Sequence, residues 1–259
     1  MQPDPRAGAQ LYTCRASCQD IDGFRTTLAR LQAIGYTCVQ LSGINWAMGV
    51  PAIARALQDH GMDCACTHMG WDDFLTRTDE LLDMHAALDC RYPAIGGLPA
   101  DYRSAEGLKR FIDELKPLAA ACAQRGMRFS YHNHHMEFLR LPDGRLWLQA
   151  LYEDTDSDTL CAELDTYWVQ EGGGDPARWI RRLPGRQPLL HLKDRMITPE
   201  GQVRMAPIGE GVLDWYDILS AAREAGVEFA LVEQDDCYGM DPVDALAISY
   251  RFLSTHGIR

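Results

Sequence analysis

Short runs of apolar residues alternate with longer amphipathic stretches along the whole chain. Eight short runs have the length and composition of strands, and they cover residues 10–17, 37–43, 62–70, 91–97, 127–134, 159–168, 188–194 and 228–236. Each run is followed by a stretch with the apolar spacing of a helix, covering residues 24–35, 50–61, 73–89, 104–126, 145–155, 176–185, 214–226 and 241–257. Pro51 near a helix start and Gly35 and Gly61 at helix ends fit these boundaries. The alternation predicts a parallel sheet, because parallel strands need helical crossovers.

The number of repeated units narrows the fold class within the α/β proteins. Eight strand–helix units in 259 residues match the size of a single (β/α)8 TIM barrel, and no linker-like segment divides the chain. We therefore expect residues 1–259 to form one domain. A doubly wound open sheet is the alternative. It is less favoured because no Gly-x-Gly-x-x-Gly motif follows the first strand, and the glycine run at 172–174 is a weak phosphate-binding signal.

Composition and charge exclude several classes of protein. The formal net charge of −12 argues against general binding to nucleic acid or to an anionic membrane. No apolar run is long enough to span a bilayer, and the first ten residues lack the pattern of a signal peptide, so we expect a cytoplasmic protein. The nine cysteines are odd in number and scattered, and no second pair at zinc spacing follows Cys64 and Cys66. We expect them to be reduced.

Polar residues collect where the predicted strands end, which is where a parallel barrel places its active site. They are His68, then His132, Asn133, His134 and Glu137, then Glu163 and Asp165, then His191, Lys193 and Asp194, and finally Glu233, Gln234 and Asp235. Any one of them is explained simply by helix capping or solvent contact. Burying such groups at four successive strand ends is costly unless they share a partner. Carboxylates with imidazole and no thiolate suit a divalent cation such as Mn²⁺, Mg²⁺, Co²⁺ or Zn²⁺.

Four segments carry a resemblance to a known family. They are YHNHHMEF (131–138), the long stretch from ELDTYW to HLKD (163–194), PIGEGVLDW (207–215) and LVEQD (231–235). In order and spacing they resemble the sugar phosphate isomerase/epimerase superfamily of xylose isomerase-like TIM barrels. The first half of the chain is similar only in its strand–helix rhythm and in THMG (67–70). The resemblance implies a divalent metal at the ends of strands five to eight, with Asp165, His191 and Glu233 as three of its ligands.

The fourth ligand is open between two residues. Many members of the family have a glutamate at the end of strand five, where this chain has His132, and Glu137 follows five residues later. We favour Glu137 as the ligand and keep His132 as the alternative. His132 and His134 lie on the same side of a strand because side chains alternate. We therefore expect both of them beside the metal as acid/base or hydroxyl-binding groups.

The resemblance also implies a type of reaction. A metal ion, with Mn²⁺ preferred, would acidify the proton next to a substrate carbonyl, and the resulting enediolate leads to an epimer, an isomer or an elimination product. We predict an isomerase or epimerase for a sugar or keto-polyol. A lyase, such as an inosose dehydratase or an enzyme that cleaves 3-keto-glycosides, is the alternative, and a non-catalytic sugar-binding barrel is the second. Related barrels that cleave abasic DNA are disfavoured by the acidity of this chain.

The remaining polar residues receive roles within this reaction. We expect Glu233 or Glu137 to act as the base, and Lys193 to stabilise the enediolate or bind a substrate oxygen. The alternative for Lys193 is an ion pair with a carboxylate such as Glu163. Three further residues are expected to contact the substrate, namely His68, Trp168 and Glu210. Core packing is the alternative for the first two. A homo-oligomer is left open.

Overall fold

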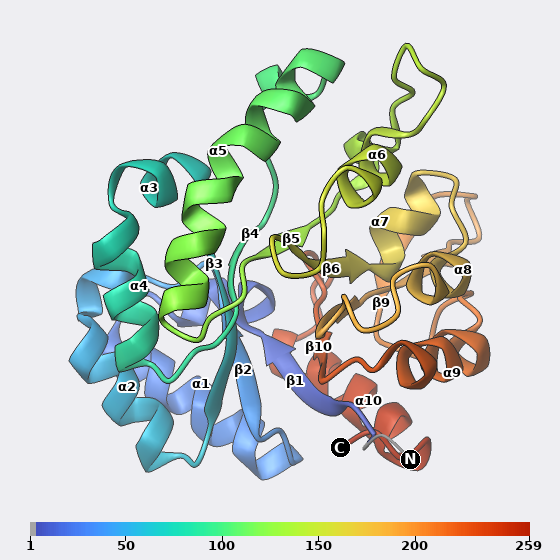
Figure 1. The fold of residues 1–259 in the computed structure, drawn as a ribbon. Coiled ribbons are helices and arrows are strands. Elements are labelled where there is room, and N and C mark those ends of the chain that lie inside the picture. Colours follow the sequence, from blue (N-terminus) through green and yellow to red (C-terminus); the bar gives the residue numbers. More distant parts are fainter. Residues whose placement is uncertain (1–3) are drawn as a thin grey trace.

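The chain folds into a closed barrel of eight parallel strands, which confirms the predicted (β/α)8 TIM barrel (Figure 1). The computed structural model describes residues 4–259, so the first three residues of the segment inspected for a signal peptide lie outside it. The barrel strands, in chain order, are β1 (Arg6–Gln10), β2 (Cys38–Leu41), β3 (Asp63–Met69), β4 (Pro93–Ile95), β5 (Ser130–His132), β6 (Cys161–Asp165), β7 (Leu189–Leu192) and β10 (Phe229–Val232). Strand β1 pairs with β10 as well as with β2, and this closure excludes the open sheet.

Helices surround the barrel and connect its strands (Figure 1). They are α1 (Ile21–Ile34), α2 (Val50–Asp59), α3 (Trp71–Thr76), α4 (Thr78–Ala87), α5 (Ala105–Gln124), α6 (Trp147–Glu153), α7 (Thr166–Glu171), α8 (Pro176–Arg181), α9 (Trp215–Ala225) and α10 (Pro242–Thr255). Side-chain caps start several of them, as Ser104 does for α5. Gly35 ends α1 at φ 123°, where a Cβ would lie 2.5 Å from the Tyr250 hydroxyl. The sequence thus places a glycine where any side chain would be strained.

Several local features differ from the sequence prediction. The first strand was expected at 10–17, but β1 ends at Gln10, and residues 11–17 form a 3₁₀ helix, η1 (Leu11–Ser17). The single helix expected at 73–89 is divided between α3 and α4 at Arg77, which has non-helical backbone angles. After β7 the chain forms an antiparallel hairpin of β8 (Asp194–Ile197) and β9 (Val203–Ala206), which apolar periodicity did not indicate.

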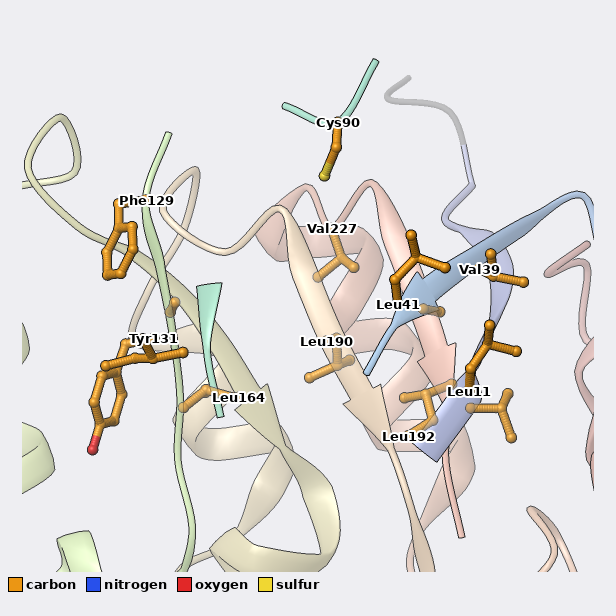
Figure 2. Packing of buried hydrophobic residues seen from close by; sticks show 14 of the residues in the cluster. Leu11, Val39, Leu41, Cys90, Phe129, Tyr131, Leu164, Leu190, Leu192 and Val227 are labelled. Atoms are coloured by element: carbon orange, nitrogen blue, oxygen red, sulfur yellow. The ribbon is translucent and has the colours of Figure 1, made fainter. Parts of the chain in front are cut away.

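The hydrophobic core has two parts because side chains alternate along each strand. Residues such as Leu190 and Leu192 of β7 belong to the large cluster that packs the strands against the helices (Figure 2). Leu189 belongs to a second, smaller cluster with Leu231, and the alternation places this cluster inside the barrel. The same alternation turns His191 to the inside, two residues after Leu189 and so closer to the carboxyl end of β7.

All nine cysteines are free thiols, eight of them buried and Cys237 half-buried, as expected. Between residues 4 and 259 no helix is both long enough and apolar enough to cross a membrane.

Candidate active site

Four side chains from four successive barrel strands meet inside the barrel. His132 ends β5, Asp165 ends β6, His191 lies in β7 and Glu233 directly follows β10. All four are buried, and each offers a ligand atom within 4.8 Å of the others. We call them the ligand group. Two imidazoles and two carboxylates are a donor set that fits a divalent transition metal. The residues present therefore match the metal that the sequence resemblance implies.

Close contacts hold the ligand group together. His132 Nε2 lies 3.2 Å from Asp165 Oδ2, and His191 Nδ1 lies 2.9 Å from Glu233 Oε2. Burial opposes the charged forms of both carboxyls. The Lys193 ammonium and the histidines outweigh this and hold the pKa of Asp165 and of Glu233 well below the usual range. The carboxylates are therefore ionised at neutral pH, as metal ligands must be.

Glu137 does not join the ligand group, which corrects our preference for it as the fourth ligand. It lies in the 3₁₀ helix η4 (His135–Phe138) and is 1% exposed. Its Oε1 accepts a hydrogen bond of 2.8 Å from the Tyr131 hydroxyl, and its Oε2 accepts one of 2.9 Å from the backbone N–H of His134. Both oxygens are thus used to fix the turn after β5. His132 is the residue that the structure brings to the other three.

Lys193 lies among three carboxylates at the edge of the ligand group. Its Nζ is 3.2 Å from Asp165 Oδ2, 2.8 Å from Glu233 Oε2 and 3.0 Å from Asp235 Oδ2. The side chain is 2% exposed, and burial alone would lower its pKa, but the three carboxylates raise it above the usual value. Lys193 is therefore charged. The ion pair considered in the sequence analysis does form, but with these three residues in place of Glu163.

A cavity of about 400 Å³ opens beside Lys193 and the ligand group. Its lining consists of Tyr12, Ser42, His68, Met69, Gly96, His132, His134, Lys193, Glu233 and Asp235. A larger cavity, of about 710 Å³, lies near the start of β3 and β10, where Asp63 and Phe229 line it. That position is the amino-terminal face of the barrel, and neither cluster of potential metal ligands in residues 4–259 lies there. We therefore take the smaller cavity as the candidate active site.

Two polar atoms on neighbouring rings have no hydrogen-bond partner, and of the two residues only His134 lines the cavity, while Trp168 is outside the lining. They are Nδ1 of His134 and Nε1 of Trp168, both buried, on rings whose centroids are 5.2 Å apart. Burial, with His132 and Lys193 nearby, lowers the pKa of His134 to about 3, so its imidazole is neutral. Unsatisfied buried polar atoms are rare in native proteins, so Nδ1 of His134 is an atom at the cavity wall that a ligand could pair.

Two further residues that were expected to contact the substrate, His68 and Glu210, differ in their position relative to the cavity. His68 lines the cavity. Glu210 is exposed and outside the cavity lining, on a loop that Asp194 organises by accepting hydrogen bonds from the backbone of Gly209 and Gly211. Gln40, which is fully buried next to His191, was not among the residues expected at the site. The sequence feature that could have identified it is the occurrence of a glutamine in the middle of the apolar run at 37–43.

Comparisons with known proteins place this barrel in a family. The model of the xylose isomerase-like TIM barrel family matches residues 28–255, and the chain therefore belongs to that family. A curated relative, the inosose dehydratase of Geobacillus thermodenitrificans (strain NG80-2), is 25% identical over 162 residues, which are 57% of this chain and 52% of the relative. The chain thus matches only about half the length of that relative.

Solved structures share the fold over nearly the whole chain. A sugar phosphate isomerase/epimerase from Parabacteroides distasonis ATCC 8503 aligns with a TM-score of 0.80 and 23% identity, covering 96% of this chain and 93% of its own. The IOLI protein, solved with a zinc atom bound, aligns with a TM-score of 0.73 and 14% identity, covering 96% and 97%. These similarities show the shared fold.

Proposed function

We propose that this protein is a divalent-metal-dependent isomerase or epimerase that removes the proton next to the carbonyl of a sugar or keto-polyol. The observation that carries the proposal is the ligand group beside a cavity that also presents Lys193 and His134. The cavity volume lies in the range of small-molecule sites. The names of the relatives, an isomerase/epimerase and an inosose dehydratase, support a sugar-like substrate.

The ligand group would hold the metal ion. When bound, a divalent cation polarises the substrate carbonyl and lowers the pKa of the neighbouring C–H. We propose Mn²⁺ first, with Mg²⁺, Co²⁺ and Zn²⁺ as alternatives, and the zinc bound in the IOLI protein supports a metal in this fold.

Glu233, which belongs to the ligand group, and two further side chains at the cavity would carry the proton transfers. Glu233 lines the cavity, and its ionised carboxylate would take the proton. The Lys193 ammonium would stabilise the negative oxygen of the enediolate. His134, neutral and with Nδ1 unpartnered, would bind a substrate hydroxyl or return the proton.

The proposal is tested first by metal content and then by exchange of the substrate proton. Elemental analysis should find about one Mn, Co, Zn or Mg per chain, and the double variant Asp165→Ala/His191→Ala should lose it. Keto-sugars and inososes incubated in D₂O with the metal-loaded protein should gain deuterium next to the carbonyl, and the metal-free protein should leave them unchanged. Absence of bound metal after incubation with Mn²⁺ would contradict the proposal.

A dehydratase is the second candidate, because the curated relative is an inosose dehydratase. Loss of a β-substituent from the same enediolate gives a product lighter by one water, whereas an epimer or isomer keeps the mass of the substrate. Mass spectrometry of the deuterium-exchange reactions separates the two. A protein that binds metal and sugar without exchange would be the non-catalytic barrel.

A further inference from the structure

Two polar side chains are completely buried inside the barrel beneath the ligand group. Glu163 belongs to β6 and Gln40 to β2, four strands apart in the closed order of eight. Gln40 Nε2 donates a hydrogen bond of 2.9 Å to Glu163 Oε1, so this contact crosses the barrel interior. A carboxylate at this depth is costly unless several groups satisfy it. Its partners therefore indicate what it does.

One partner is the candidate ligand His191. Its Nε2 lies 2.6 Å from Gln40 Oε1 and 2.9 Å from Glu163 Oε1. Because the amide nitrogen of Gln40 donates to Glu163, its oxygen is the atom presented to His191. His191 Nε2 therefore carries a proton and donates it, and Nδ1 is left facing Asp165 and Glu233. A ligating imidazole must offer one bare nitrogen to the metal, and the contacts behind the ring decide which nitrogen that is.

The other partner is His68, at the wall of the cavity. Its Nε2 lies 2.8 Å from Glu163 Oε2, and its ring stacks on the His191 ring with centroids 5.4 Å apart. On the far side, a Cβ on Gly96 would lie 2.9 Å from His68 Nδ1, so the glycine leaves room for this ring. Glu163 thus contacts the cavity residue His68 through Oε2. Through Oε1 it contacts the candidate ligand His191 and its partner Gln40.

We propose that Glu163 is a positioning residue for the metal site, acting on His191 directly and through Gln40, and on His68 at the cavity wall. The inference rests on the proposed metal site and adds a group outside the ligand set. Carboxylates and carbonyls behind a ligating histidine fix its orientation and tautomer. Their loss typically weakens metal binding by about 10- to 100-fold.

The test compares two identical substitutions at buried glutamates. We expect Glu163→Gln to raise the Mn²⁺ dissociation constant by about 10- to 100-fold. Glu137→Gln is the matched control, because it removes a buried carboxylate outside the ligand group. It should change the dissociation constant by less than about threefold, since its hydrogen bonds go to Tyr131 and to the His134 backbone and not to a member of the ligand group. Thermal unfolding of the metal-free variants separates a positioning effect from loss of the fold.

A spectroscopic readout follows the tautomer itself. Nitrogen NMR of histidine-labelled, zinc-loaded protein should show one metal-bound and one protonated ring nitrogen for His191. In Glu163→Gln the ordered tautomer signal should broaden or divide. Should Glu163→Gln fail to fold, Gln40→Met interrupts the same chain of hydrogen bonds and keeps the carboxylate, with the same expected results.

Two results would overturn the inference. One is unchanged metal affinity and tautomer in both Glu163→Gln and Gln40→Met. The other is an equal loss of affinity in the Glu137→Gln control. Failure of the wild-type protein to bind Mn²⁺, Co²⁺ or Zn²⁺ is a different result, because it contradicts the proposed function itself.

Discussion

Lys193 neutralises the carboxylates of the candidate site, and substitution of this one residue tests how much that neutralisation contributes to stability. Its ammonium lies within 3.2 Å of Asp165, Glu233 and Asp235. Lys193→Met keeps the volume of the side chain but leaves the buried carboxylates of Asp165 and Glu233 without their counter-charge. We expect the metal-free variant to lose about 3–5 kcal/mol of unfolding free energy, the usual cost of removing one partner from a buried ion pair.

Added Mn²⁺ should restore more stability to Lys193→Met than to the wild type, because the cation takes over part of the missing charge. Urea unfolding with and without a chelator measures both effects. Lys116→Met is the control, since Lys116 pairs with Asp113 on the exposed surface and should change stability within error. Equal stability of the two variants without metal would contradict this prediction.

At the residue scale, Asp165, His191 and Glu233 stood out as polar residues in or directly after apolar runs, and the family resemblance implied them as ligands. The same reasoning did not separate His132 from Glu137. That choice depends on the end of β5 and on Tyr131, whose hydroxyl binds the Glu137 carboxylate. Such a contact between a strand residue and the following turn leaves no periodic signal in the sequence.

At the scale of elements, His85 links helix α4 to strand β3. Its side chain is fully buried, with Nδ1 2.6 Å from the Leu81 carbonyl oxygen and Nε2 2.6 Å from the Thr67 hydroxyl. A carbonyl only accepts, so Nδ1 carries the proton and Nε2 accepts from Thr67. Burial lowers the pKa of His85 to about 4, from an ordinary value of 6.5. The folded protein therefore keeps this imidazole neutral.

This pKa shift makes stability depend on pH in a defined direction. As pH falls through 6.5 the unfolded chain binds a proton at His85 and the folded chain does not, so stability present above pH 6.5 is lost towards pH 4. The loss amounts to about 3 kcal/mol when complete. We expect His85→Gln to remove this component. Urea unfolding between pH 7 and pH 4 would show a shallower decline for the variant, and parallel curves would contradict the assignment.

The sequence predicted most helices and strands because their apolar spacing is regular, and it failed where local hydrogen bonds override the spacing. The apolar residues of η1 predicted a strand. They form a 3₁₀ helix instead, and the Gln10 side chain caps it by accepting a hydrogen bond from the Tyr12 N–H. Hairpin β8–β9 is half exposed, and much of its order comes from strand pairing. These features depend on partners that periodicity does not identify.

At the scale of the whole molecule, the count of eight units predicted the barrel, but only the pairing of β1 with β10 demonstrates closure. Closure brings the two ends of the described chain together, where the Ala7 N–H donates to the Arg259 carbonyl oxygen at 3.0 Å. Residues from both halves of the chain also meet at the candidate site inside the barrel. Its ligand group comes from the second half of the chain, and Gln40 from β2 supports it.

We therefore propose that residues 1–259 are one domain in which metal binding stabilises both halves equally. At a free Mn²⁺ concentration of 100 times its dissociation constant, the gain should be about 2.7 kcal/mol. Hydrogen exchange should show this gain for the slowest amides of β2 and β3 as well as for those of β7 and β10, because amides that exchange through global unfolding share one free energy. Asp165→Ala/His191→Ala should show no gain. A gain confined to β7 and β10 would mean that the two halves open separately, and the single cooperative domain would then be wrong.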